Sequence, residues 1–138
     1  MEAAAGLRAF ALRLAPGEDL RPALERCARE RGLTAAFVLA GIGSLRSAGL
    51  RCAGQEQGQQ LEGPFEILSL CGSLGPDGAH LHIQLADSSG RCRGGHLLAG
   101  SPVFTTAELL IAVLPGLTFG RRFDPQSGYP ELFIEPSG

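Results

Sequence analysis

The sequence predicts an α+β domain in which an antiparallel β-sheet is flanked by one or two helices. Its 138 residues suit a single domain over residues 1–138, with a core over about residues 7–134. One early segment shows the 3.6-residue period of an amphipathic helix, whereas from Ala35 onward short apolar runs alternate with Gly, Pro, Asp and Ser. Many strands with irregular turns and one clear helix favour a sheet that carries a helix on one face.

The chain begins with a predicted strand over Leu7–Leu14. Phe10, Leu12 and Leu14 alternate within it and therefore share one side. Pro16-Gly17 then ends the strand.

The next segment predicts the helix. Its apolar side chains recur at helical spacing, at Leu20, Leu24, Cys27 and Ala28. The acids Glu18 and Asp19 lie where the positive end of the helix dipole favours them, and Pro22 falls in the first turn, where its missing N–H is harmless. Gly32 is the expected C-terminal stop.

The remainder predicts strands. The apolar runs are Ala35–Ala40, Ala48–Ala53, Phe65–Gly72, His80–Leu85, Gly95–Leu98, Glu108–Leu114 and Leu132–Ile134. For Glu108–Leu114 a helix stays an alternative, because a short apolar run does not distinguish the two by period. We interpret Gly41-Ile42-Gly43 as a strand-ending turn and Ser44 as a helix cap or turn residue without a catalytic role.

Composition narrows the functional class. The chain is 44% hydrophobic and 19% charged, with a net charge of −2, and all twelve basic residues are arginine. Most arginines have acids nearby, so the sequence lacks the basic stripe of a nucleic-acid binder, and the pair Arg121-Arg122 is too short to form one. The longest apolar run, Leu109–Pro115, is far below the ~20 residues of a membrane span. The start of the chain shows no signal-peptide pattern, so we expect a cytoplasmic protein.

The four cysteines are irregularly spaced, at Cys27, Cys52, Cys71 and Cys92. They form no Cys-x-x-Cys pair, which argues against a thiolate zinc site or a thioredoxin-like motif. We interpret them as small, buried apolar residues.

The sharpest chemical pattern comes from the three histidines. Within 78–87, Leu81, Ile83 and Leu85 fall on one face of a strand and are predicted to point to the core. His80 and His82 then share the other face with Gln84, at a backbone separation of about 6.5 Å. His96 follows two adjacent glycines, which permit close backbone approach.

Three neutral imidazoles with an open position suit Zn²⁺ or a similar divalent metal, so His80, His82 and His96 form a candidate metal site. Such an ion could activate water or hold the structure together. The alternative is three hydrogen-bonded histidines that line a polar cleft or a subunit contact. Glu66, Asp87 and Glu108 are candidate fourth ligands or outer-shell partners of the histidines.

Several motifs, in order, resemble the plants-and-prokaryotes conserved domain family (PPC, also written PCC). The matching elements run from about Leu7 to Leu114: Arg8-x-Phe10, Pro16–Asp19, Gly41–Ser44, Ala48–Arg51, Gly63–Leu70, Gly72–Leu74, His80–His82, Asp87, Gly90, Gly94–Leu97, Val103 and Thr106–Glu108. No single piece is diagnostic, but the ordered set is specific.

The resemblance implies an antiparallel sheet with flanking helices, assembled as a homotrimer, in a stand-alone bacterial member of the family. In plant members a basic AT-hook outside this domain binds DNA, while the domain itself assembles subunits and recruits other factors. This chain has no Arg-Gly-Arg-Pro hook. The resemblance therefore implies a regulatory module that acts through self-association and other regulatory proteins, with direct DNA binding doubtful.

The resemblance also implies two sites. A plant segment used for partner contacts is matched by Gly63, Phe65, Glu66, Ile67 and Leu68, with Pro64 replacing an arginine. Phe65 and Ile67 are expected on one face of that strand and Leu68 and Leu70 on the other, which favours core plus subunit interface over a recruited partner. Some bacterial relatives hold a metal at the matching histidines. The competing functions are a trimeric regulatory module, a direct DNA binder, and a metal-dependent enzyme or metal sensor.

Overall fold

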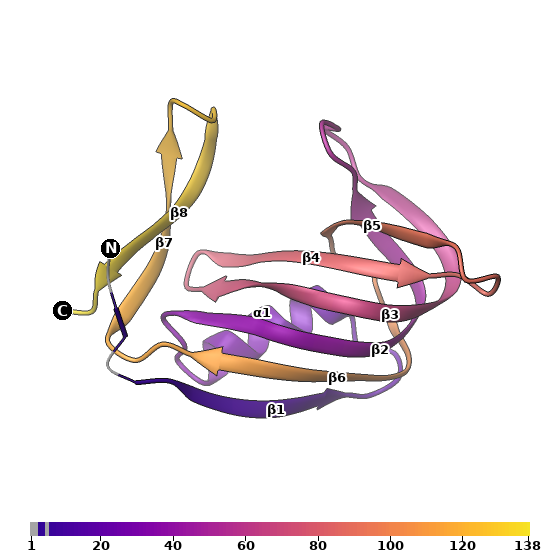
Figure 1. Cartoon of the computed structure of the whole chain (residues 1–138), viewed down its shortest axis with the longest axis horizontal. Coiled ribbons are helices and arrows are strands. Elements are labelled where there is room, and N and C mark those ends of the chain that lie inside the picture. The colour runs from indigo at the N-terminus through magenta and orange to yellow at the C-terminus, as the bar shows by residue number, and fades with distance from the viewer. Residues whose placement is uncertain (1–2, 5) are drawn as a thin grey trace.

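The computed structural model describes residues 3–4 and 6–138 and contains a six-stranded antiparallel sheet, one α-helix and a separate two-stranded hairpin (Figure 1). The elements, in chain order, are β1 (Arg8–Leu14), α1 (Leu20–Glu30), β2 (Ala36–Arg51), β3 (Gln59–Gly75), β4 (Gly78–Ala86), β5 (Cys92–Leu97), β6 (Val103–Val113), β7 (Leu117–Asp124) and β8 (Tyr129–Pro136). The sheet order is β1-β6-β2-β3-β4-β5, and the end of β2 also pairs with β5. The predicted α+β class and antiparallel sheet are confirmed.

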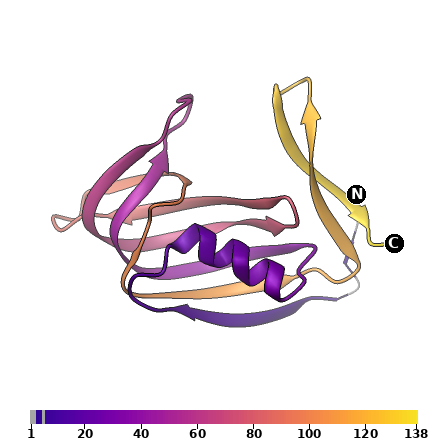
Figure 2. The same ribbon diagram turned by 180° about the vertical axis from the view of Figure 1, so that it is seen from behind.

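Helix α1 covers one face of the sheet (Figure 2) and leaves the other open. The buried residues of α1 are Leu20, Ala23, Leu24 and Ala28. They match the predicted apolar stripe except that Ala23 is added and Cys27 is only half-buried. Asp19 is the N-cap residue, but its carboxylate makes no cap hydrogen bond. The carboxylate instead accepts hydrogen bonds from the backbone N–H groups of Gly100 and Ser101, at 2.8 and 3.0 Å. These bonds connect the start of the helix to the loop before β6.

Alternation along β4 follows the prediction. Leu81, Ile83 and Leu85 are buried in the core between sheet and helix, while His80 and His82 are exposed on the open face. This single alternation places apolar packing and candidate chemistry on opposite sides of the same strand.

Strand β2 differs from the prediction because it runs unbroken for 16 residues through the expected turn at Gly41–Gly43. The Cα of Gly43 lies so close to β6 that a Cβ there would overlap the backbone of Thr106. Ser44 is neither a helix cap nor a turn residue; its Oγ lies 2.7 Å from Oγ1 of Thr105 and joins β2 to β6. The predicted glycine break is therefore a site of close strand packing.

Strand β3 corrects a second expectation. The pairing of β3 with β4 shifts register between Ile67 and Ser69, so a bulge turns Leu70 to the core side, where it is fully buried beside Ile67. Leu68 remains on the outside, 47% exposed. Glu108–Leu114, for which a helix was the alternative, lies within β6.

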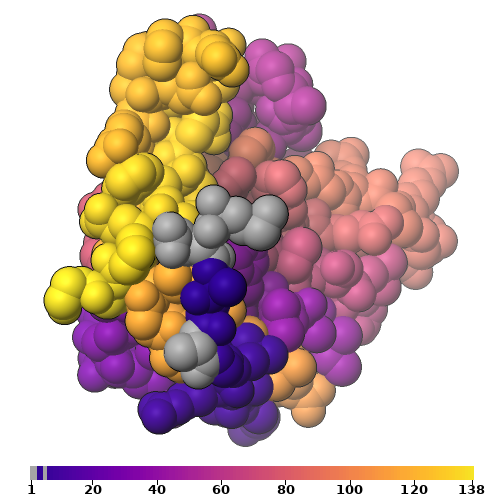
Figure 3. Space-filling model, turned by 60° about the vertical axis from the view of Figure 1, so that its left-hand side comes forward, coloured from indigo at the N-terminus to yellow at the C-terminus, as the bar shows by residue number. Residues whose placement is uncertain are grey.

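The β7–β8 hairpin stands at the end of the sheet where β3 turns into β4 (Figure 1) and projects from the body of the domain (Figure 3). Phe119 packs edge-on against Phe37 of β2, with ring centroids 5.6 Å apart, and the hydroxyl of Thr34 donates to the carbonyl oxygen of Leu117 at 2.7 Å. Among the described residues, no helix has the length and hydropathy that crossing a bilayer requires.

Candidate metal centre

The three histidines converge on the open face. His80 and His82 project from β4, and His82 lies directly opposite His96 in the β4–β5 pairing. Ring centroids are 4.7 to 5.2 Å apart, and one nitrogen from each ring lies within 4.8 Å of the others. Among the described residues, this is the group of His, Cys, Asp and Glu side chains that is close enough to share an ion.

Local backbone packing brings His96 into the cluster. The last residues of β2 pair with β5, with Arg51 opposite His96. A Cβ on Gly95 would lie only 2.7 Å from the carbonyl oxygen of Arg51, so the predicted close backbone approach next to His96 is present.

The environment favours the neutral form of two of the imidazoles. Partial burial of the ring lowers the pKa of His80 below 6.5, and the charges of His82 and Arg121 lower it further, whereas the carboxylate of Glu131 raises it. Burial also lowers the pKa of His96, and the charges of Arg51 and His82 lower it further. Neutral imidazole is the form that binds a metal ion.

The donor set fits a borderline divalent ion. Zinc–nitrogen bonds of about 2.0–2.1 Å in a tetrahedron separate the donor nitrogens by about 3.4 Å. The observed nitrogen separations of up to 4.8 Å need only small side-chain rotations to reach that value. Three ligands leave one tetrahedral position for water or another ligand.

His80 and His82 border a hollow of about 260 Å³ between the sheet and the β7–β8 hairpin. Its lining comprises Phe37, Cys71, Gly72, Ser73, His80, His82, Arg121, Glu131 and Leu132. Sequence reasoning missed the contribution of Arg121 and Glu131. Cys71 was expected to be buried but is exposed, directly opposite His82 in the β3–β4 pairing.

The acids proposed as partners of the histidines do not join them. Within the β4–β5 turn, the carboxylate of Asp87 accepts hydrogen bonds from the hydroxyl and backbone N–H of Ser89 and from the backbone N–H of Arg91. These bonds lower the pKa of Asp87. Glu66 and Asp87 instead line a different hollow. Glu108 lies on β6 opposite Ile42 of β2. None of these acids belongs to the histidine group.

The predicted contact segment divides between core and surface. Phe65 and Ile67 are buried within the single chain, whereas Gly63, Glu66 and Leu68 are exposed. Of these five predicted contact residues, another molecule could contact only the three exposed ones, Gly63, Glu66 and Leu68, in this conformation.

Among curated proteins, the chain is 49% identical over 130 residues to the bifunctional protein GlmU of a Synechococcus strain. The match covers 94% of this chain but 21% of that protein, so the chain spans about a fifth of the length of this relative.

Two solved structures superpose on most of the chain. A hypothetical protein from Salmonella superposes with a TM-score of 0.94 at 42% identity, covering 98% of this chain and 97% of the other. A protein from Archaeoglobus fulgidus that is described as metal-containing superposes with a TM-score of 0.81 at 34% identity, covering 91% and 93%. The family model of the Plants and Prokaryotes Conserved (PCC) domain matches residues 1–115, which include all three histidines, and the chain therefore belongs to this family.

Proposed function

We propose that this protein is a metal-binding PCC-domain module that holds a divalent ion of the zinc type on His80, His82 and His96. The observation that carries the proposal is the set of three imidazole nitrogens within 4.8 Å of one another. The similar Archaeoglobus protein, described as metal-containing, supports it. A bound ion would connect β4 to β5 and supply Lewis acidity at its open position.

Elemental analysis of protein prepared without an affinity tag tests the site. Reconstitution with Zn²⁺ followed by dialysis should leave about one equivalent per chain, and His82→Ala should retain less than about a tenth of an equivalent, because two imidazoles bind zinc far more weakly than three. Gln84→Ala is the matched control, since Gln84 is exposed on the same strand face but lies outside the histidine group. Equal zinc in wild type and His82→Ala, or none in the wild type, contradicts the proposal.

We further propose that the module assembles as a homotrimer through the open face of the sheet. Four large apolar side chains from β2, β3 and β6 are 40% to 56% exposed there: Leu39, Ile42, Leu68 and Leu110. Exposed apolar side chains of this kind are typical of an association site, and in a closed trimer each copy would place a different one of its faces against this one. Leu68 belongs to the segment for which the sequence predicted a subunit contact.

Light scattering after size-exclusion chromatography tests the assembly. Wild-type protein should have three times the 14.4 kDa mass of one chain. The double variant Leu39→Glu/Leu110→Glu should dissociate, because charges would be buried without partners. Leu7→Glu is the control, since Leu7 is equally apolar and 62% exposed but precedes β1. A monomeric wild type, or a double variant that keeps the wild-type mass, contradicts this assembly.

The charge balance favours regulation through contacts with other proteins over regulation through direct DNA binding. With twelve arginines against fourteen acids, the chain offers no excess of positive charge to phosphates. Action on transcription would therefore depend on other regulatory proteins that the trimer brings together.

A further inference from the structure

The hollow beside the histidines has two walls of different origin. One wall is the open face of the sheet, with His80 and His82 from β4, and the other is the β7–β8 hairpin, with Arg121 and Leu132. Arg121 and Leu132 are cross-strand partners and therefore lie on the same side of the hairpin. The hairpin follows the 1–115 region that the PCC family model matches, so this wall lies outside the matched region.

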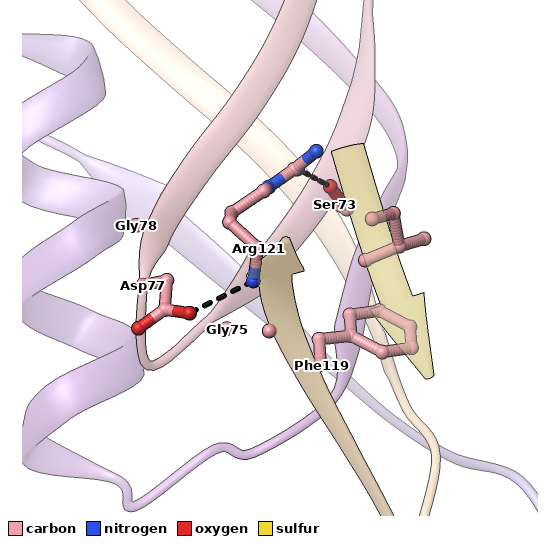
Figure 4. Close-up of a pocket in the computed structure, with 8 residues that line it drawn as sticks. Ser73, Gly75, Asp77, Gly78, Phe119 and Arg121 are labelled. Carbon is pink, nitrogen blue, oxygen red and sulfur yellow. Dashed lines mark hydrogen bonds between the residues drawn. The ribbon is translucent and has the colours of Figure 1, made fainter. Parts of the chain in front are cut away.

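Arg121 is held in place by hydrogen bonds to β3 and to the β3–β4 turn. Its backbone N–H donates to Oδ2 of Asp77 at 2.8 Å, and its Nη2 donates to Oγ of Ser73 at 3.0 Å (Figure 4). The ion pairs formed among residues 3–4 and 6–138 are Arg21–Glu25 and Arg26–Glu18, so no described carboxylate pairs with the Arg121 guanidinium. The guanidinium is half-buried and oriented by a hydroxyl, and a group in this state has N–H donors left for an external anion.

The rest of the lining indicates which anion. Phe37 and Leu132 supply apolar surface, and Phe37 is fixed by its edge-on contact with Phe119. Glu131 adds a negative charge, which disfavours a doubly charged group such as a phosphate monoester. The volume of about 260 Å³ is just below the range of pockets for drug-sized ligands, which indicates a small molecule.

The geometry points to this hollow as the binding site of a small organic monocarboxylate whose charged end lies between Arg121 and the ion on the histidines. The planar guanidinium matches a carboxylate in shape, and the apolar part of the ligand packs against Phe37 and Leu132. This inference rests on the proposed metal site, because the ion supplies the second positive charge that the carboxylate meets.

Calorimetric titration of zinc-loaded, untagged protein tests it. Benzoate should bind with a Kd of about 1 mM or tighter, while its neutral isostere benzamide and the dianion phenyl phosphate should each bind at least about tenfold more weakly. Arg121→Gln should weaken benzoate binding at least about tenfold, because a charge-assisted hydrogen bond is lost. Arg121→Lys keeps the positive charge but lacks the planar guanidinium. Its affinity for benzoate should lie between those of the wild type and Arg121→Gln.

Arg122→Gln is the matched control. Arg122 is the next residue of β7, but its guanidinium lies over the ring of Phe133, 3.5 Å from the centroid, and it does not line the hollow. Circular dichroism and zinc content are measured on the same samples. Zinc present with equal benzoate affinity in wild type and Arg121→Gln, or tighter binding of phenyl phosphate, overturns this inference alone. A wild type that binds no zinc overturns the metal proposal and this inference together.

Discussion

Gly72→Ala is expected to destabilise the protein by about 3–5 kcal/mol and to remove its metal affinity. Gly72 lies in β3 between Val38 of β2 and Leu81 of β4. Its φ of +149° is one that L side chains rarely adopt, and a Cβ there would overlap the carbonyl oxygen of His80 and the Cα of Leu81. Since those atoms are backbone, relief requires β4 to move.

Displacement of β4 couples stability to the site. Leu81 is fully buried, so moving its backbone disrupts core packing. The same movement shifts the strand that carries His80 and His82 relative to His96 on β5.

Urea unfolding followed by circular dichroism measures the loss of stability, and elemental analysis of the folded fraction measures the metal. Gly128→Ala is the matched control, because Gly128 also has a positive φ, +81°, but open space at its Cβ position. It should cost only about 1 kcal/mol and leave zinc content unchanged. A Gly72→Ala protein within 1 kcal/mol of wild type that retains its zinc would show that the close contact between β3 and β4 is not required.

Local periodicity was sufficient to predict much of the fold. Alternation at Leu81, Ile83 and Leu85 correctly separated the core face of β4 from the histidine face, and the spacing of Leu20, Leu24 and Ala28 correctly located the helix. These predictions succeed because each depends only on neighbours along one strand or one helix.

The errors come from contacts between distant segments. Leu70 is buried because the β3–β4 pairing shifts by one residue between Ile67 and Ser69, and such a shift reverses which face a side chain occupies. Gly43 has the composition of a turn, but it allows β6 to pass close to β2. Neither fact can be deduced from the local sequence.

The candidate site shows the same division. His80 and His82 were predicted to lie together because they are two residues apart on one strand, and His96 joins them through the pairing of β4 with β5. Arg121 reaches the same hollow from a hairpin about forty residues further along the chain, positioned by Asp77 and Ser73. Only the tertiary fold reveals that contribution, whereas Asp87, which is close in sequence, is held in a turn.

Zinc affinity is expected to fall steeply in acid, with Kd rising at least about 100-fold between pH 7.5 and pH 5. Zinc binds each imidazole in its neutral form, so protons compete with the ion at His80, His82 and His96. Acidification adds protons to the metal-free site, which stabilises that site and weakens binding.

The lowered pKa values of His80 and His96 move the start of this fall to lower pH. Because partial burial lowers the pKa of His80 and His96 below 6.5, both rings take up a proton at a lower pH than a fully solvated imidazole does. Affinity should therefore be nearly constant above pH 7 and decline only at a lower pH than three unperturbed imidazoles would give. Calorimetric zinc titrations of the wild-type protein across this range measure the slope. A Kd that stays constant down to pH 5 would mean that oxygen ligands, and not these imidazoles, hold the ion.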